Sequence, residues 1–190
     1  MSDALPILTQ RRFEAAFAKG IYEEMKTELG EATTKRILSN AVIKLAKQTA
    51  AEMAQQAPGG APSLDSFRAI LPRWTAEDAL HIEVVESSDR AFHFNVTRCR
   101  YAEMYRAMGL AELGDVLSCN RDGAFCEGYD PRLKLQRTQT LMGGATHCDF
   151  RYRWTPEPND RIPRFSCPRL ARKEPSTWSA PSQSSTLRTT

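Results

Sequence analysis

The first sixty or so residues carry apolar side chains at three- and four-residue intervals, a spacing that places them on one face of a helix. One stripe ends at Gly30 and a second ends in the APGGAP segment, Ala57–Pro62. Ser63 is expected to cap a short third helix. We interpret all three stripes as faces that pack into the core. They consist of Phe13, Ala16, Phe17, Ile21, Met25 and Leu29; of Ile37, Leu38, Ala41, Val42, Leu45 and Ala46; and of Leu64, Phe67, Ile70 and Leu71.

After Trp74 the apolar period changes from near four to two, which is typical of strands with one buried face. The alternation predicts strands at Leu80–Glu86, Ala91–Arg98, Leu133–Leu141 and Thr146–Trp154. A helical pattern runs from Tyr101 to Cys126 between the two strand pairs. Because tight turns join consecutive strands, the pattern predicts an α+β fold with N-terminal helices packed on one face of an antiparallel sheet of about four strands.

The length of 190 residues favours one domain, which we place at residues 1–154. The tail at residues 155–190 differs in composition, because prolines interrupt it repeatedly and it closes on serine and threonine. We expect this tail to be disordered and to carry no functional residue.

Charge and composition narrow the class of protein. The formal net charge is +3 and the basic residues are spread along the chain, so we expect no nucleic-acid partner. No apolar run approaches the roughly 20 residues that span a bilayer, and the N-terminal segment lacks the order of a secretory signal. We therefore expect a cytoplasmic protein with no membrane partner. The five cysteines form an odd number without a CxxC pair, which favours free thiols over disulfides or a zinc ribbon. We expect no metal and no cofactor.

The most conspicuous candidate chemistry lies at His147, Cys148 and Asp149. Neighbours on a strand point to opposite faces, so these three side chains cannot act as a consecutive triad. Cys148 shares its face with aromatic residues, which favours a buried structural thiol. The side chains of His147 and Asp149 share the polar face. A bulge beside Gly143–Gly144 would shift this register by one residue.

Two further clusters pair a thiol with charged neighbours. Cys99 ends the second predicted strand where a helix begins, and the helix dipole with Arg98 and Arg100 would lower its pKa. Cys119 and Asp122 are three residues apart and share one helix face. For each of these cysteines, ordinary packing is the alternative interpretation.

Three sequence elements support a family resemblance. They are RCxY at Arg98–Tyr101, CxxD at Cys119–Asp122, and TQTLMxGxxxCDFRY ending at Tyr152. With them the chain resembles the L-2-amino-thiazoline-4-carboxylic acid hydrolase family, loosely from Phe13 and closely from Phe94 to Trp154. The resemblance implies hydrolytic ring opening of 2-amino-thiazoline-4-carboxylate to N-carbamoyl-L-cysteine, a step toward L-cysteine, with this small molecule as the partner.

The residue types suit that chemistry. A thiolate or an activated water would attack C2 of the ring, a carboxylate would hold the amidine nitrogens, and an arginine would hold the substrate carboxylate. We expect Cys99, Cys119, Cys148, Asp122, His147 and Asp149 to converge as catalytic residues, with Arg137, Arg98 and Gln139 binding substrate. Cys99 is the preferred nucleophile, Asp122 or Asp149 would hold the amidine, and His147 would shuttle protons. Two alternatives stay open: a non-enzymatic small-molecule sensor, and a cysteine-ligated metal protein. The sequence does not decide the oligomeric state.

Overall fold

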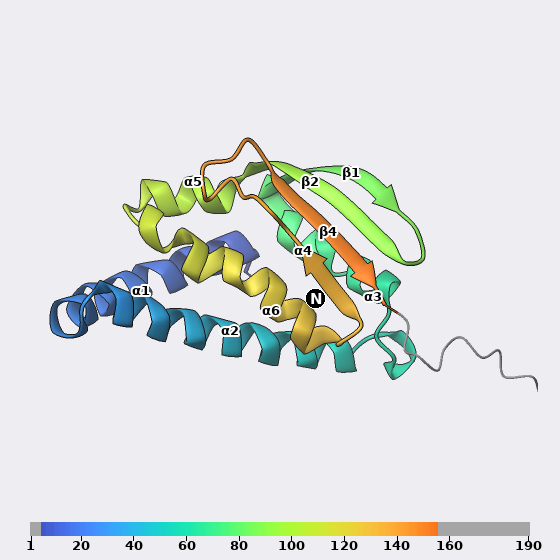
Figure 1. Ribbon diagram of the computed structural model, residues 1–190, viewed down its shortest axis with the longest axis horizontal. Coiled ribbons are helices and arrows are strands. Elements are labelled where there is room, and N and C mark those ends of the chain that lie inside the picture. Colours follow the sequence, from blue (N-terminus) through green and yellow to red (C-terminus); the bar gives the residue numbers. More distant parts are fainter. Residues whose placement is uncertain (1–4, 156–190) are drawn as a thin grey trace, which may run out of the picture.

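The computed structural model describes residues 5–155 and confirms the predicted α+β fold, with the N-terminal helices first (Figure 1). The helices are α1 (Ile7–Leu29), α2 (Glu31–Gln55), α3 (Leu64–Arg68), α4 (Leu71–Thr75), α5 (Arg100–Ala107) and α6 (Asn120–Tyr129). Short helical turns are η1 (Pro58–Gly60), η2 (Ala76–Asp78), η3 (Ala111–Leu113) and the π-helical η4 (Asp115–Cys119). The strands are β1 (Leu80–Ser87), β2 (Ala91–Cys99), β3 (Leu133–Gln136) and β4 (Cys148–Trp154).

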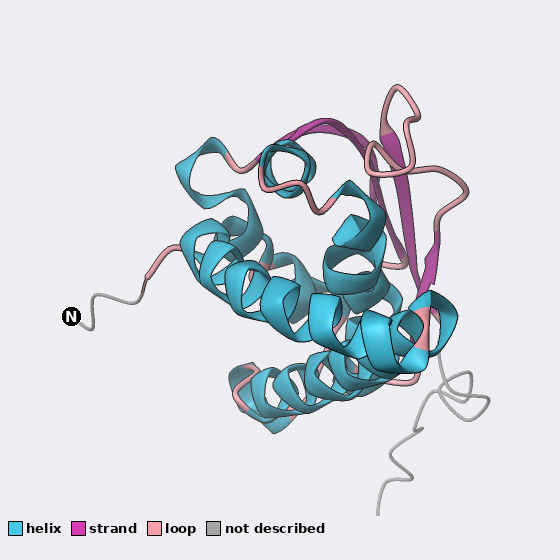
Figure 2. Cartoon of the chain, turned by 90° about the vertical axis from the view of Figure 1, so that its left-hand side faces the viewer, coloured by secondary structure: helices cyan, strands magenta, loops and turns pink. Residues whose placement is uncertain are grey.

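The four strands form one antiparallel sheet in the order β1-β2-β4-β3. Figure 2 shows the sheet along one side of the molecule and the helices gathered on the other. The two hairpins meet where β2 pairs with β4, so the long-range pairing in the middle of the sheet joins the two halves of the C-terminal region.

Aromatic side chains on the helix-facing side of the sheet form the main core. Phe94 lies opposite Phe150 in the register, and their rings stack with centroids 5.0 Å apart. Tyr152 extends this row to Phe67 of α3, whose ring centroid lies 4.8 Å away. The capping box predicted by Ser63 begins α3 and orients Phe67 toward the layer, because Ser63 and Ser66 exchange hydrogen bonds at its first turn.

Helix α6 closes this core from below by packing tightly on α2. The rings of Phe125 and Tyr129 of α6 stack on each other, and both contact Phe67 of the aromatic layer. At Gly128 the two helix backbones touch, since an added Cβ would lie 2.6 Å from Cα of Lys47. A residue with a side chain does not fit there without separating the helices.

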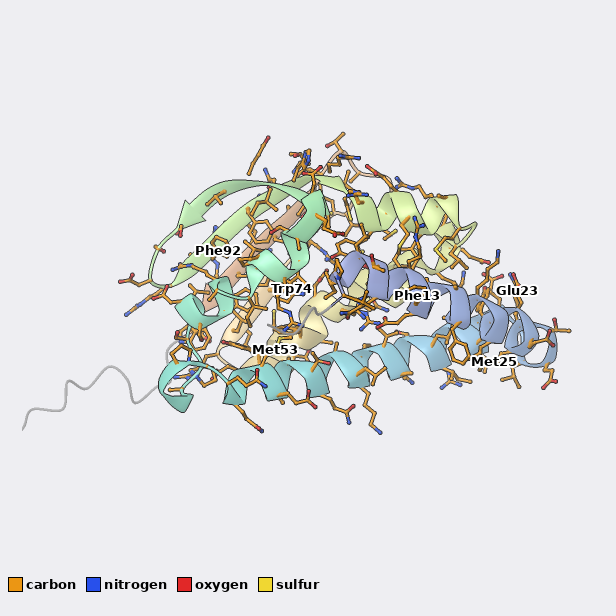
Figure 3. All side chains as sticks on the ribbon, turned by 180° about the vertical axis from the view of Figure 1, so that it is seen from behind. Phe13, Glu23, Met25, Met53, Trp74 and Phe92 are labelled. Carbon is orange, nitrogen blue, oxygen red and sulfur yellow. The ribbon has the colours of Figure 1, made fainter. Side chains whose placement is uncertain are left out.

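A second core lies between α1, α2 and α5 and corrects one expectation. Ala15 and Tyr22 are the residues of α1 that are buried, together with Val42 of α2 and Tyr105 of α5. The α1 stripe interpreted as core-facing instead contains exposed side chains: Phe13 (labelled in Figure 3), Phe17, Ile21 and Leu29. In α2, Val42 and Ala46 are buried as expected, whereas Ile37 and Leu45 are exposed. The core-facing line of α1 uses small and aromatic residues on the opposite side of the helix.

Two predicted elements are shorter than their patterns indicated. The helical pattern from Tyr101 is broken at Gly109, whose φ of 69° ends α5. Strand β3 ends at Gln136, and β4 begins at Cys148, so residues 137–147 form a loop where strand continued in the prediction. The predicted tail at residues 155–190 lies outside the described residues except for Thr155. Within the described part, no helix is long and apolar enough to cross a membrane.

The α2–α6 contact gives a test of the fold with an internal control. Gly128→Ala should lower the free energy of unfolding by roughly 1–3 kcal/mol, although alanine favours helix, because its Cβ overlaps the α2 backbone. Gly123→Ala in the same helix meets no atom within 4 Å and should be neutral or stabilising by up to about 1 kcal/mol. Urea denaturation of the two variants measures the difference, and equal stabilities would contradict this packing.

Candidate active site

Residues from four separate segments meet beneath one end of the sheet, where β2 runs into α5 and β4 begins. Cys99 comes from the end of β2, Cys148 from the first position of β4, and Cys119 with Asp122 from η4 and α6. The charge of Asp122 acts on the titration of all three thiols, so these groups lie around one carboxylate. The sequence predicted that six side chains converge; the structure places these four near one another, and His147 and Asp149 have other partners.

The charged centre of this cluster is an ion pair between Asp122 and Arg137. Arg137 Nη1 donates to Asp122 Oδ2, while Nη2 donates to the carbonyl oxygen of Cys119 at 3.1 Å. The guanidinium also lies 5.1 Å from the ring centre of Phe150. Burial raises the pKa of Asp122 above its usual value, and the Arg137 charge works against this rise. The pKa of Asp122 is thus set by two opposing effects, desolvation and the charge of Arg137, and desolvation is the larger.

Cys99 occupies the predicted helix terminus but lacks the predicted activation. Its Sγ accepts the Ala102 N–H at 3.4 Å, as a capping residue does. Burial nevertheless raises the pKa of Cys99 to about 11. The two neighbouring arginines are engaged elsewhere: Arg98 Nε donates to Glu103 at 2.8 Å and Arg100 donates to the carbonyl of Glu77. The expected lowering of the Cys99 pKa is therefore wrong, because desolvation outweighs the helix terminus.

The other thiols are also held in the protonated form. Burial, followed by the charge of Asp122, raises the pKa of Cys119 to about 12. Cys148 is buried on the aromatic face, as strand parity predicted, and its pKa is raised by burial. Its Sγ accepts the Leu141 N–H at 3.1 Å and so ties the loop to the start of β4. Cys126 is packed in the core, and Cys167 lies outside the described residues.

Asp149 lies on the opposite face of β4 and holds the loop. Its Oδ1 accepts the N–H groups of Thr138 and Gln139, each at 2.9 Å, and Oδ2 accepts the Thr138 hydroxyl at 2.6 Å. Burial works in the other direction, yet these hydrogen bonds lower the pKa of Asp149. With its carboxylate fully engaged, Asp149 fixes the backbone immediately after Arg137.

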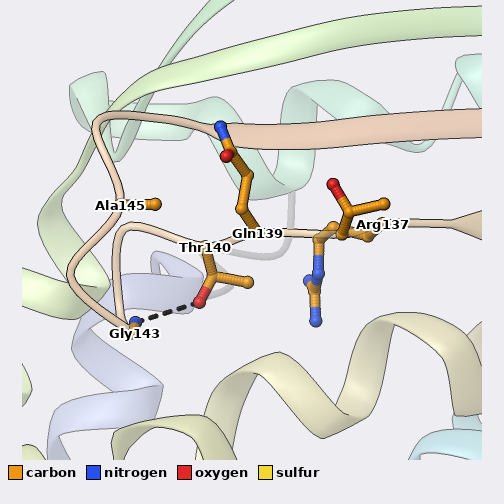
Figure 4. A pocket seen from close by; sticks show the side chains of 6 residues that line it. Arg137, Gln139, Thr140, Gly143 and Ala145 are labelled. Carbon is orange, nitrogen blue, oxygen red and sulfur yellow. Dashed lines mark hydrogen bonds between the residues drawn. The ribbon is translucent and has the colours of Figure 1, made fainter.

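His147 also lies apart from the thiols. The side-chain amide of Gln139 contacts its ring, with Nε2–Nε2 at 2.9 Å, and the Thr146 hydroxyl lies 3.1 Å from Nδ1. Figure 4 shows Gln139 pointing away from Arg137, which itself points toward α6. The contacts of His147 within the described chain do not include Asp122 or any cysteine, so the structure does not join it to the cluster.

Two depressions share Arg137, the arginine of the ion pair, in their linings. One, of about 410 Å³, is formed by the loop residues drawn in Figure 4. The other, of about 260 Å³, is lined by Arg137 with Cys119, Asn120, Gly123 and Leu135. Of the predicted thiols, Cys119 is thus the one on a depression wall. Sequence reasoning missed Asn120 and Gly123; an available signal was their position beside Asp122 in α6, where Gly123 leaves room that a side chain would fill.

The loop around these depressions is fastened at several points. Arg106 Nη2 donates to the Leu141 carbonyl at 2.5 Å, and Thr140 Oγ1 accepts the Gly143 N–H at 3.0 Å. Met142 packs on Gly114, where an added Cβ would lie 3.1 Å from Met142 Cε. Arg137 is therefore presented by a loop whose backbone is fixed on both sides.

Comparison with known proteins identifies a family. The family model of the L-2-amino-thiazoline-4-carboxylic acid hydrolases matches residues 10–152. No curated protein matches the chain significantly. Among solved structures, the phenol-responsive sensory domain of the transcription activator PoxR, crystallised with phenol, aligns with a TM-score of 0.49 and 11% identity. That alignment covers 74% of this chain and 73% of the PoxR domain.

The role of Asp149 as a loop anchor predicts a pH-dependent stability effect. Its pKa is depressed in the folded state, so its stabilisation is present above the unfolded pKa of about 3.9 and is lost as pH falls through the folded value. Asp149→Asn should lower the melting temperature at pH 7, and the gap to the wild type should narrow as the pH is lowered to about 2, through the depressed folded pKa. Asp65→Asn, at a side chain that is 85% exposed, serves as the control. A gap of constant size at both pH values would contradict the anchoring role.

Proposed function

Because the chain belongs to the L-2-amino-thiazoline-4-carboxylic acid hydrolase family, we propose that it hydrolyses L-2-amino-thiazoline-4-carboxylate to N-carbamoyl-L-cysteine. The observation that carries this proposal is the Asp122–Arg137 ion pair between the two depressions. The substrate offers one cation-forming group and one anion, and the pair offers the complementary charge to each.

On binding, the substrate replaces the Asp122–Arg137 ion pair with two new ion pairs, one to each residue. Its 2-amino-thiazoline ring is an isothiourea that carries a delocalised positive charge when protonated, and its 4-carboxylate is negative. The planar guanidinium of Arg137 suits the carboxylate, which it can hold with two parallel hydrogen bonds. Asp122 suits the protonated N–C–N group of the ring. Arg137 lines both depressions, and the Asp122 side chain is 33% exposed, so both remain reachable.

The reaction adds one water and breaks one carbon–sulfur bond. As the water oxygen bonds to C2, Asp122 takes one of its protons as general base. The tetrahedral carbon then expels the ring sulfur, and the Asp122 proton passes to that sulfur as it leaves. As the C2 hydroxyl becomes the carbonyl of a carbamoyl group that keeps both nitrogens, its remaining proton is released to solvent, which balances the proton that the cationic ring brought in. The product carries a free thiol. The raised pKa of Asp122 suits a residue that accepts a proton and then returns it.

In this proposal the cysteines pack around the site and do not act as nucleophiles. A nucleophilic cysteine needs its thiolate, and burial raises the pKa of Cys99 to about 11 and of Cys119 to about 12. We therefore assign attack to water and assign the thiols to packing around Asp122. Cys119, which lines a depression, is the cysteine whose replacement tests this assignment most directly.

The test follows the thiol released from L-2-amino-thiazoline-4-carboxylate with a chromogenic disulfide, comparing the L- and D-substrates. Asp122→Asn should lower kcat by about 10²-fold or more, since it removes the base. Arg137→Gln should raise KM by roughly 10- to 100-fold through loss of a charge-assisted contact, and Arg137→Lys should recover part of it. Cys119→Ser, Cys99→Ser and Cys148→Ser should each keep most of the activity.

The outcomes separate the function from the mechanism. Absence of thiol release by the wild-type protein would refute the proposed reaction. Release that survives Asp122→Asn but is lost in Cys119→Ser would keep the reaction and replace water by a thiolate nucleophile. Asp65→Asn provides a matched carboxylate-to-amide control outside the site, and its kinetics should equal those of the wild type.

A further inference from the structure

Both helices of the α1–α2 hairpin carry apolar side chains that the described chain leaves uncovered. On α1 the row Phe13, Phe17 and Ile21 is 63%, 75% and 39% exposed. On α2, Ile37 and Leu45 are 37% and 54% exposed. Four-residue spacing makes the α1 set one continuous row, and on α2 Ala41 stands between Ile37 and Leu45 in the same row. Exposed phenylalanines in such a row mark a contact surface more often than a solvated helix face.

A glycine beside the α1 row, Gly20, is not required by any close contact among the described residues. Gly20 lies inside α1, three residues after Phe17, and is exposed. An added Cβ there would meet no atom of the described chain within 4 Å, unlike the tight contact at Gly128. Glycine costs a helix interior about 1 kcal/mol relative to alanine. A side chain from outside, seated against the bare backbone, would use the space that Gly20 leaves.

Charged side chains accompany the two rows with opposite sign. On α1 the positions one before the apolar row start at the exposed Arg12, beside Phe13, and continue through Gly20 to the exposed Glu24 and Glu28, so the part of this row toward the α1–α2 turn is acidic. The corresponding row on α2 contains Arg36 and Lys44, also exposed. Within residues 5–155, these two glutamates and the two basic residues of α2 take part in none of the ion pairs, although their neighbours Glu23, Lys35 and Lys47 do. The hairpin therefore carries an apolar row on α1 that is acidic toward the turn, and an apolar row on α2 that is accompanied by basic residues.

We propose that this face binds a second copy of the chain, with α1 of one copy against α2 of the other. A two-fold axis brings each row of one copy onto the other kind of row of its partner, so the contact occurs twice and buries both apolar rows. Glu24 and Glu28 then meet the Arg36 and Lys44 side of the partner's α2. Pairing α1 with α1 would instead bring acidic rows together.

Sedimentation equilibrium of the full chain tests the dimer and its surface. The wild type should have twice the 21.4 kDa monomer mass at high concentration. Phe17→Glu should be monomeric at the same concentration, with an unchanged circular dichroism spectrum. The control is Val85→Glu, at an exposed apolar residue of β1 outside the proposed contact, and this variant should remain dimeric.

Charge reversal in mixtures tests which helices meet. One variant carries Glu24→Lys with Glu28→Lys, and the other carries Arg36→Glu with Lys44→Glu. Each alone faces like charges across the contact, and its dimer should weaken by roughly tenfold or more. Mixed in equal amounts, the two variants should form a heterodimer as stable as the wild-type dimer, since every reversed row then meets its opposite.

Several results would overturn the proposal. The proposal is wrong if the wild-type chain stays monomeric at all concentrations. Binding of the monomer to lipid vesicles through Phe17 would show that a membrane surface occupies this face instead. A Phe17→Glu variant that still dimerises places the dimer contact elsewhere. Failure of the two charge variants to form the heterodimer excludes the pairing of α1 with α2 of a second copy.

Discussion

The register between β2 and β4 is the constraint on which both the core and the candidate active site depend. Phe94 opposite Phe150 directs their rings toward the helices, and the same alternation sends Cys148 inward and Asp149 outward. A slip of one residue would turn the aromatic rings to water and bring Asp149 into the core, at a cost of several kcal/mol. With the register fixed, Asp149 accepts the backbone N–H groups of Thr138 and Gln139, so β3 ends at Gln136. The side chain of Arg137 then reaches Asp122 beneath the sheet. Apolar packing thereby decides which polar atoms meet.

Burial then decides what those polar groups can do. Arg137 compensates the Asp122 charge directly, so a carboxylate can remain beneath the sheet, while desolvation still raises its pKa. The thiols have no comparable partner. Cys99 receives only backbone N–H groups, from Ala102 and Tyr101, and the nearby arginines turn outward to Glu103 and Glu77. The same environment raises the pKa of the carboxyl group and of the thiols, which favours Asp122 over a cysteine in the proposed reaction, because a nucleophilic cysteine needs its thiolate.

Sequence periodicity predicted much of this architecture and only part of the site. The two-residue alternation found the strands and the face of Cys148, because one side of the sheet is buried along its length. It overextended β3, since the side chain that ends this strand, Asp149, lies more than ten residues away in the chain. The convergence of Cys99, Cys119, Cys148 and Asp122 was accessible from their positions at element ends. Their titration was not, because desolvation depends on neighbours that only the packed fold supplies.

The α1 stripe shows the opposite case, in which the periodicity is clear and the fold leaves it unused. Phe13 and Phe17 are 63% and 75% exposed, and fully burying a phenylalanine contributes about 1.5–3 kcal/mol. A two-fold contact buries both phenylalanines of each copy, so their burial contributes at most roughly 6–12 kcal/mol to the free energy of association. Association itself costs about 4–15 kcal/mol, so the apolar rows alone would give a weak and poorly oriented contact. The acidic row of α1 and the basic row of α2 supply the missing discrimination, because only the α1–α2 pairing between copies places opposite charges at both ends of the two-fold contact.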